Sequence, residues 1–355
     1  MKALVLCAGR GTRLRPLTYT RSKAALPLAG RPVLAHILQY LHRFGFADVG
    51  VVISPGQEEL KALAAASPGQ RVEFIVQKQP LGIAHAVAAA GDYLGQEDFL
   101  LYLGDNLTDE NLLPALGRFA AEQPDAIIAV RPVANPSAYG IAEVDGDRVR
   151  RVWEKPASPP GNLAIAGIYL LRPSIHTAIA QLTPSARGEY EITDALAGLL
   201  AQGRTILTHP MTGWWQDMGT PEGMLTANAL LLDAISTEIA PDVSLQNAKV
   251  QGRMVIGPGV QLENVRLRGP LLIGAGSVLR DAYVGPYTSV GEGAHISGAS
   301  LEHSILLPGC RLEGPIFHLE DCLLGRGAVV EVKSGRTVTL LLGDDGRLQI
   351  PRGRR

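Results

Sequence analysis

The stretch that decides the fold opens the chain: Lys2-Ala-Leu-Val-Leu-Cys-Ala8, then Gly9-Arg-Gly-Thr-Arg-Leu-Arg-Pro-Leu-Thr18, then Lys23-Ala-Ala-Leu-Pro27. Its apolar run from Ala3 to Cys7 predicts a short strand that is buried on both faces. Two glycines then flank Arg10, and glycine lets backbone N–H groups turn toward a ligand. Five basic residues follow closely: Arg10, Arg13, Arg15, Arg21 and Lys23. Cations beside a glycine turn favour a polyphosphate site.

Two better-known phosphate loops do not fit this stretch. GRGTR is not GxxxxGK[ST], and Leu14 stands where the dinucleotide fingerprint has its third glycine. On the loop alone, a solvated basic turn after a core strand is the alternative interpretation.

Strands and helices then alternate along the chain. We expect strands at 49–53, 72–76, 99–103 and 126–130, and helices at 33–44, 57–66, 82–94 and 109–122. This order predicts a Rossmann-like α/β fold: a mixed, mostly parallel sheet with helices on both faces. Ligands of such sheets bind at the carboxyl ends of the strands.

Polar residues stand directly after several of these strands. Gln77 has an amide that can donate and accept hydrogen bonds, as a pyrimidine edge requires, although a solvated glutamine would look the same. His85 lies in an alanine-rich helix and is predicted to pack in the core. Asp105 offers a hard oxygen ligand for Mg²⁺, although Asp-Asn is also ordinary turn chemistry. Asp217, in Trp214-Trp-Gln-Asp-Met-Gly-Thr220, supplies a second carboxylate.

The whole opening string, GxGTRLxPLT followed by Lys-x-x-Leu-Pro, resembles the N-terminal signature of the sugar-1-phosphate nucleotidyltransferases. These enzymes join a nucleoside triphosphate to a sugar phosphate and release pyrophosphate. The family usually has proline after the lysine, where this chain has Ala24. The resemblance implies that Arg13 and Lys23 are catalytic. It also implies that the nucleotide is bound by Ala8, Gly9, Gly11, Thr12, Gln77 and Gly82.

Further motifs extend the resemblance to the metal and the sugar. Asp105 and Asp217 match the family's metal aspartates, which implies Mg²⁺ as cofactor. Sugar-phosphate binding is implied for residues in Tyr139-Gly-Ile141, Trp153-Glu-Lys-Pro156 and Ala164-Ile-Ala-Gly-Ile-Tyr169, namely Gly140, Glu154, Lys155, Gly167 and Tyr169. In Ala186-Arg-Gly-Glu-Tyr-Glu-Ile-Thr-Asp194, Thr193 is a candidate helix N-cap, and Glu191 and Asp194 are interpreted as structural.

The helical pattern ends after a predicted helix at 220–235. A hexad then recurs at Ile256-Gly, Ile273-Gly, Val284-Gly, Val290-Gly and Leu324-Gly. This period predicts a parallel β-helix of four to five coils, left-handed, with each aliphatic side chain pointing inward. We predict a nucleotidyltransferase domain at 1–235, a linker at 236–250 and the β-helix at 251–332. A C-terminal hairpin and tail are expected at 333–355.

Composition excludes several classes of partner. The formal net charge is −1, so neither nucleic acid nor an anionic membrane is favoured as a partner. The three cysteines are widely spaced, which fits a reducing cytoplasm rather than a disulfide framework or zinc site. The apolar run at the start of the chain is too short for a signal peptide, and no apolar run has the length of a membrane span. We expect a cytoplasmic homo-oligomer.

Within the family, GDN, ARGEYEITD and the appended β-helix look most like the long form of glucose-1-phosphate thymidylyltransferase. That branch implies dTTP and glucose-1-phosphate as substrates. UTP or another nucleotide, and an acetyltransferase activity in the β-helix based on His295, His303 or His318, are the alternatives. A non-catalytic regulatory subunit is disfavoured, because Arg13, Lys23 and both aspartates are present. We expect the β-helix to serve packing and assembly, so that removing residues from about 250 onward affects stability more than the nucleotide site.

Overall fold

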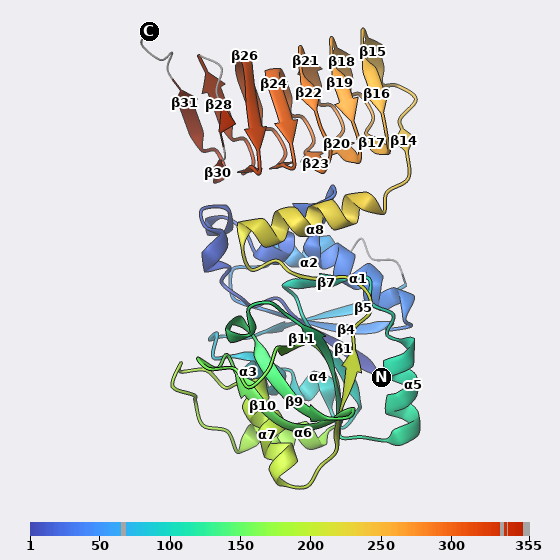
Figure 1. Ribbon diagram of the computed structural model, residues 1–355, viewed down its shortest axis with the longest axis vertical. Helices are drawn as coiled ribbons and strands as arrows, with labels where there is room; N and C mark the ends of the chain where they lie inside the picture. Colours follow the sequence, from blue (N-terminus) through green and yellow to red (C-terminus); the bar gives the residue numbers. More distant parts are fainter. Residues whose placement is uncertain (65–68, 334–336, 339, 351–355) are drawn as a thin grey trace. The chain divides into compact units, whose positions relative to one another are not determined.

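The computed structural model describes residues 1–64, 69–333, 337–338 and 340–350 (Figure 1). The chain divides into two compact units. The first comprises Met1–Gly9 and Leu34–Trp215, and the second comprises Arg10–Val33 and Gln216–Arg355. The boundary predicted near 235 therefore falls inside the second unit. The basic segment that follows the first strand also belongs to the second unit, which the sequence pattern did not indicate.

A nine-stranded sheet forms the first unit (Figure 1). Its order is β5 (Arg71–Val76), β4 (Asp48–Ile53), β1 (Lys2–Leu6), β6 (Phe99–Leu103), β11 (Leu163–Leu171), β8 (Ala126–Pro132), β12 (Ile206–Pro210), β10 (Arg148–Glu154) and β9 (Gly140–Asp145). Strands β5, β4, β1 and β6 pair in parallel, and so do β8 and β12. Antiparallel pairs join β11 to β6 and β8, and β10 to β12 and β9. The sheet is mixed, as predicted, with a larger antiparallel part than expected.

The helices around this sheet are α1 (Val33–Arg43), α2 (Glu59–Ala64), α3 (Ile83–Ala89), α4 (Gly91–Leu94), α5 (Leu113–Glu122), α6 (Ser174–Ala180) and α7 (Ile192–Ala201). Of these, α3, α4, α6 and α7 contribute side chains to one apolar core with the sheet. The spacing of apolar residues correctly predicts helix α1, because Leu34, Ile37, Leu38 and Leu41 recur at helical spacing and are fully buried.

Three predicted helices need correction. The predicted helix at 82–94 is two helices, because the chain bends at Ala90. The helix predicted at 109–122 begins only at Leu113, after strand β7 (Asn106–Thr108). The helix predicted at 57–66 is Glu59–Ala64, and its predicted last two residues lie outside the described residues.

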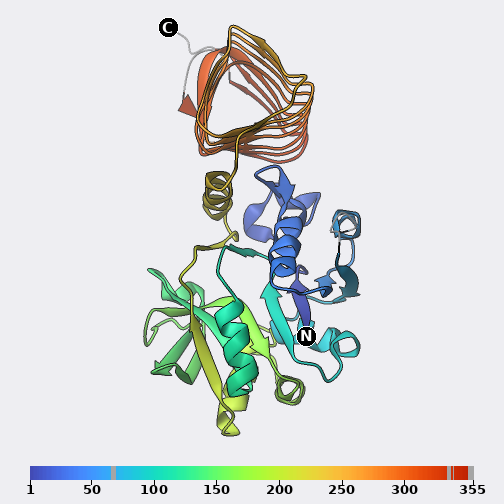
Figure 2. The same cartoon turned by 90° about the vertical axis from the view of Figure 1, so that its right-hand side faces the viewer.

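The second unit contains α8 (Pro221–Asp233), whose N-cap Thr220 accepts a hydrogen bond from the Gly223 amide at 3.1 Å. A parallel β-helix follows, and its coils form a triangle when seen end-on (Figure 2). One side has seven strands: β14 (Glu238–Ile239), β17 (Met254–Ile256), β20 (Leu271–Ile273), β23 (Thr288–Val290), β25 (Ile305–Leu306), β27 (Leu323–Leu324) and β30 (Leu341–Leu342).

The other two sides of the triangle form one sheet, because strands β24 and β26 each run around the corner from one side to the next. Their strands are β15 (Ser244–Gln246), β16 (Lys249–Gln251), β18 (Gln261–Glu263), β19 (Arg266–Arg268), β21 (Val278–Arg280), β22 (Tyr283–Val284), β24 (His295–Glu302), β26 (Arg311–Glu320), β28 (Val329–Val332), β29 (Thr337–Val338) and β31 (Arg347–Ile350). The sheet pairs β2 (Pro27–Leu28) with β3 (Arg31–Pro32), and β13 (Trp215–Asp217) with β7, complete the strands.

Two predicted boundaries of the β-helix are wrong. The predicted linker at 236–250 forms its first coil, because β14, β15 and β16 pair in parallel with the next coil. The predicted C-terminal hairpin is a further coil, since β29, β30 and β31 pair in parallel with β26, β27 and β28. Both segments lack the hexad spacing that revealed the middle coils. The predicted Arg-rich end, Arg352, Arg354 and Arg355, lies outside the described residues.

Within the described residues, no helix combines the length and the apolar composition that crossing a membrane requires.

The inward aliphatic ladder makes a prediction about stability. Ile273 is fully buried, whereas Ile239 occupies the equivalent position in the first coil and is 44% exposed. Ile273→Ala should therefore destabilise the β-helix by about 2–5 kcal/mol through lost burial and a cavity. Ile239→Ala should cost about 1 kcal/mol or less. Thermal unfolding of the two variants measures the difference, and equal destabilisation would contradict the assigned register.

Candidate active site

The turn after β1 carries the first group of predicted residues. Ala8 is buried, and its carbonyl accepts a hydrogen bond from the Ser54 hydroxyl at 2.7 Å, while Gly9 is exposed. Gly11 has φ +58°, and its carbonyl accepts a hydrogen bond from the Thr18 hydroxyl at 2.7 Å. A Cβ on Gly11 would lie 3.0 Å from the Thr18 side chain. Glycine is therefore required there by backbone conformation and by space.

The predicted catalytic residues lie on short helical turns of the second unit. Thr12 and Arg13 lie in a 3₁₀ turn, Thr12–Leu14, and both side chains are exposed. Lys23 begins another such turn, Lys23–Ala25, whose cap is the Ser22 hydroxyl. That hydroxyl accepts a hydrogen bond from the Ala24 amide at 3.3 Å. A proline at position 24 has no N–H and could not make this bond.

Arg13 and Asp217 meet around one glycine of the second unit. A Cβ on Gly219 would lie 3.0 Å from Asp217 Oδ1 and 3.4 Å from the Arg13 guanidinium. The Gly219 amide donates a hydrogen bond to Asp217 Oδ1 at 2.7 Å, which fixes the orientation of the carboxylate. The fold thus brings a cation and a carboxylate, far apart in sequence, to the same place.

Two of the five basic residues have other partners. Arg15 lies over the Tyr19 ring, 5.0 Å from its centroid. Arg21 forms an ion pair with Asp344 at 2.7 Å. The interpretation of all five cations as one phosphate-binding cluster is therefore wrong for Arg21, whose partner is far away in the sequence, and it stays a prediction for Arg15.

In the first unit, Gln77 organises the turn that begins α3. Gln77 is 4% exposed, and its amide nitrogen donates to the Gly82 carbonyl at 3.2 Å and lies 2.9 Å from His85 Nδ1. His85 is half-buried and stacks on Tyr190, so its predicted place in the core is wrong. Gly82 has φ +103°, and a Cβ on it would lie 2.6 Å from the Tyr190 carbonyl oxygen.

Asp105 and Gly167 are brought together by a residue that sequence reasoning missed, Asn106. Its amide nitrogen donates to Asp105 Oδ1 at 2.9 Å, and a Cβ on Gly167, which has φ +75°, would lie 2.9 Å from the same nitrogen. Asn106 is 4% exposed, and its Oδ1 has no hydrogen-bond partner among the described residues. The chain therefore places a polar, oxygen-bearing environment at the carboxyl end of β6.

Glu154 collects three partners around the predicted sugar site. Thr193 donates its hydroxyl hydrogen to Glu154 Oε2 at 3.0 Å, Arg187 lies 3.3 Å from Oε1, and Lys155 Nζ lies 3.6 Å from Oε1. A Cβ on Gly140 would lie 3.1 Å from Thr193 and 3.5 Å from Glu154 Oε2. Gly140, Glu154 and Lys155 are therefore close together, as their motifs predicted.

Two residues near Glu154 change earlier interpretations. The N-cap of α7 is Glu191, not Thr193, whose hydroxyl points to Glu154 instead. Glu191 is 3% exposed and pairs with Arg187, and burial, followed by the charge of Glu154, raises the pKa of its carboxyl. This agrees with its structural interpretation. Arg187 lies in the ARGEYEITD string, and the sequence pattern does not predict its contact with Glu154.

Tyr169 lies near both Asp105 and Glu154 in the first unit. It is 3% exposed in β11, paired with Leu101 of β6. Burial, followed by the negative charges of Glu154 and Asp105, raises its pKa. The same ring thus lies within electrostatic range of the predicted metal ligand and of the predicted sugar ligand.

Two carboxylates offer the kind of oxygen ligand that Mg²⁺ prefers. Asp105 in the first unit accepts a hydrogen bond from the Asn106 side-chain amide, and Asp217 in the second unit accepts one from the Gly219 backbone amide. In the described part of the chain, no group of three or more His, Cys, Asp or Glu is arranged to hold a metal ion alone. Mg²⁺ is commonly held through one or two protein carboxylates together with substrate phosphates, so a larger protein cluster is not required.

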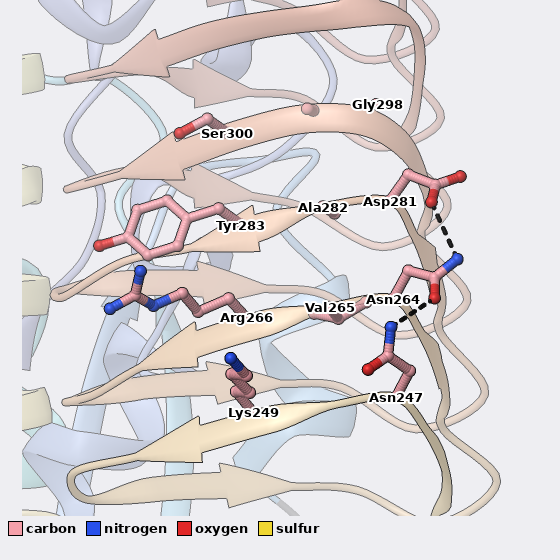
Figure 3. Close-up of a pocket in the computed structure, with 11 residues that line it drawn as sticks. Asn247, Lys249, Asn264, Val265, Arg266, Asp281, Ala282, Tyr283, Gly298 and Ser300 are labelled. Carbon is pink, nitrogen blue, oxygen red and sulfur yellow. Dashed lines mark hydrogen bonds between the residues drawn. The ribbon is translucent and has the colours of Figure 1, made fainter.

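A hollow of about 460 Å³ lies on the surface of the β-helix (Figure 3). Lys249, Arg266 and Tyr283 occupy equivalent positions on successive coils along it, and Asn264 joins the side chains of Asn247 and Asp281 beside them. None of the three histidines considered for acetyl transfer is among the described residues that line it. The hollow therefore offers no histidine base for that chemistry.

Comparisons with known proteins agree with these motifs. The family described as nucleotidyl transferase matches residues 2–234. The chain is 42% identical to the low-salt glycan biosynthesis nucleotidyltransferase Agl11 of Haloferax volcanii, over 99% of this chain and 100% of that protein. It is 39% identical to a glucose-1-phosphate thymidylyltransferase of Streptomyces griseus, over 99% of both chains.

A solved structure of a UDP-glucose pyrophosphorylase complexed with UDP-glucose has a TM-score of 0.60 and 25% identity. It covers 66% of this chain and 99% of that one.

Proposed function

The chain belongs to the nucleotidyl transferase family, and we propose that it transfers a thymidylyl group from dTTP to glucose-1-phosphate, releasing pyrophosphate. Two relatives that the chain matches over 99% of its length are glucose-1-phosphate thymidylyltransferases. The observation that carries the proposal is the meeting of Arg13 and Asp217 around Gly219, which brings the cation proposed to bind phosphate beside the carboxylate proposed to bind the metal ion.

The reaction is a single displacement at phosphorus. An oxygen of the glucose-1-phosphate phosphate attacks the α-phosphorus of dTTP, and the bond from that phosphorus to the bridging oxygen of the β-phosphate breaks. The electron pair of that bond leaves with pyrophosphate. The chain offers no nucleophile with an adjacent base in its motifs, so we propose no covalent enzyme intermediate.

Catalysis would then consist of positioning and charge neutralisation. Arg13 would hold the β- and γ-phosphates as they leave, and Lys23 would neutralise the α-phosphate. Lys155 would orient the attacking phosphate, and Glu154, held by Thr193 and Arg187, would accept hydrogen bonds from sugar hydroxyls.

Asp105 and Asp217 would hold Mg²⁺. When bound, the metal ion supplies positive charge against the phosphate oxygens, which carry more negative charge in the transition state.

The turn between Gln77 and Gly82 is the part of the chain proposed to meet the base. The Gln77 amide nitrogen is bonded to the Gly82 carbonyl and lies 2.9 Å from His85 Nδ1, so this side chain would hold the turn in one conformation. We assign to this turn the reading of the pyrimidine edge that dTTP and UTP share, and the rejection of purines by size. dTTP differs from UTP by one methyl group on the base and one hydroxyl on the sugar.

The carboxylates generate the first prediction of function. Asp105→Asn and Asp217→Asn should each lower turnover by several orders of magnitude, because each removes a negative charge that attracts the metal ion. Asparagine keeps the Oδ1 acceptor for the orienting hydrogen bond, so the fold should survive. Steady-state rates at saturating Mg²⁺ test this, with circular dichroism as the check of folding.

Matched controls are Asp92→Asn in the first unit and Asp233→Asn in the second, both exposed side chains outside the proposed site. Both controls should keep the wild-type rate. A near wild-type rate for Asp217→Asn would refute the metal assignment.

Nucleotide preference is the second prediction of function. The enzyme should use dTTP in preference to UTP by about 10- to 200-fold in kcat/KM, because one methyl group contributes that much in a fitted pocket. Activity with UTP should remain measurable. A competition assay with the common triphosphates and glucose-1-phosphate, read by pyrophosphate release, measures the ratio. A strong preference for ATP or GTP would remove the role given to Gln77.

A further inference from the structure

The segment that carries Arg13 and Lys23 is docked on the last coil of the β-helix, within the second unit. The Thr20 hydroxyl donates a hydrogen bond to Asp344 Oδ2 at 2.7 Å. Arg21 donates two more to the same oxygen, from Nε at 3.2 Å and from NH2 at 2.7 Å. These contacts join residues more than 300 positions apart in the sequence, so they arise only in the folded chain.

The turn that presents Asp344 is itself fixed. The other carboxylate oxygen of Asp344 accepts a hydrogen bond from the Arg326 amide in the preceding coil, at 2.8 Å. A Cβ on Gly343 would lie 3.0 Å from Pro16, so this turn and the segment touch closely. The carboxylate is therefore held at the backbone of the β-helix on one side and at the segment on the other.

This ion pair is largely withdrawn from water, with the Arg21 side chain 14% and the Asp344 side chain 8% exposed. Burial raises the pKa of Asp344, but the hydrogen bonds from Thr20, the Arg326 amide and Arg21 outweigh burial and hold the pKa below its usual value. The carboxylate is charged at neutral pH, and its hydrogen bonds to Arg21 are of the strong, charge-assisted kind.

A second attachment holds the far end of the segment. The Asn228 side chain of α8 is fully buried, and its Oδ1 accepts hydrogen bonds from the Ala29 amide at 2.9 Å and from the Ser289 hydroxyl at 2.7 Å. Gly30, with φ +76°, packs so closely on Leu272 of β20 that a Cβ would lie 2.8 Å from it. The segment is therefore fixed to the β-helix beyond Lys23 as well as between Arg13 and Lys23.

We propose that Asp344 is a positioning residue for nucleotidyl transfer: through Thr20 and Arg21, it fixes the segment that presents Arg13 and Lys23 to the nucleotide phosphates. The roles of Arg13 and Lys23 rest on the function proposed above. The β-helix is then a structural part of the phosphate-binding apparatus. Displacement of a catalytic group by about 1 Å can lower a rate by about 100-fold, so loss of this anchor has kinetic consequences.

The test compares Asp344→Ala, Asp344→Asn and Arg21→Ala with the wild-type enzyme, at a temperature well below unfolding. Asp344→Ala should lower kcat/KM for dTTP by at least about 10-fold while KM for glucose-1-phosphate stays nearly constant. Asp344→Asn should lose less, because its one side-chain oxygen can still accept a hydrogen bond either from the Arg326 amide or from Thr20 and Arg21. Arg21→Ala combined with Asp344→Ala should lose no more than Asp344→Ala alone, because Arg21 acts through its contact with Asp344.

Asp321→Asn is the matched control. It changes the same type of side chain in a turn of the same β-helix, where its partner is His303 and both side chains are partly exposed. This control should keep wild-type kinetics. Equal losses for Asp321→Asn and Asp344→Asn would overturn the proposal, as would wild-type kcat and KM for dTTP in Asp344→Ala, whatever its melting temperature.

Hydrogen exchange gives a readout that does not depend on activity. In Asp344→Ala and Arg21→Ala, backbone amides of residues 11–25 should exchange faster, and those of the sheet in the first unit should not. Unchanged exchange would overturn the proposal that Asp344 fixes this segment. An inactive wild-type enzyme would instead refute the proposed function, and faster exchange in the variants would still establish that Asp344 fixes the segment.

The docking also revises the expectation for the β-helix as a whole. Removing residues from about 250 onward would take away both Asp344 and Ser289. We therefore expect such a truncation to impair the nucleotide site as well as stability, in contrast to the expectation from the sequence.

Discussion

A completely buried amide, that of Asn228, is the constraint on which the second unit depends. It lies on α8 and hydrogen-bonds Ala29, Ser289 and the Tyr287 carbonyl, so that three separate stretches of chain must meet at one point. A buried amide left without partners costs about 1–3 kcal/mol. The segment after β1, helix α8 and the β-helix are consequently one packed body, in agreement with their grouping in a single unit.

The first unit holds several charged groups around one half-buried glutamate, Glu154. Glu154 has cationic neighbours in Arg187 and Lys155, and it has Glu191 as a negative neighbour. The positive charges balance Glu154 while leaving it an acceptor, which suits a group proposed to receive hydroxyl hydrogens. Because Thr193 and Gly140 hold its other side, the geometry comes from the fold rather than from a bound ligand.

The sequence predicted best where the information is local. The strand at β1, helix α1 and the inward ladder of the β-helix follow from the spacing of apolar residues, and the family follows from contiguous strings. It failed where a partner is distant. Arg21 looks like one more cation of a phosphate loop until Asp344 is seen beside it, and the segment at 236–250 looks like a linker until its strands pair with the next coil. The prediction that Thr193 is a helix N-cap failed for the same reason, because the local pattern cannot reveal that the Thr193 hydroxyl is bonded to Glu154.

Ala24 shows how the two kinds of information combine. The family's usual proline at this position restrains φ and would stiffen the turn after the lysine by covalent means. This chain lacks that ring and uses the Ala24 amide to bond the Ser22 hydroxyl instead. A hydrogen bond of this kind restrains the turn only if the surrounding chain is already held. Arg21 and Thr20 on one side, and Ala29 on the other, are the residues fixed to the β-helix and α8. Tertiary contacts therefore supply in this chain part of the order that proline supplies elsewhere, and the placement of Lys23 depends on the β-helix as much as on the loop that carries it.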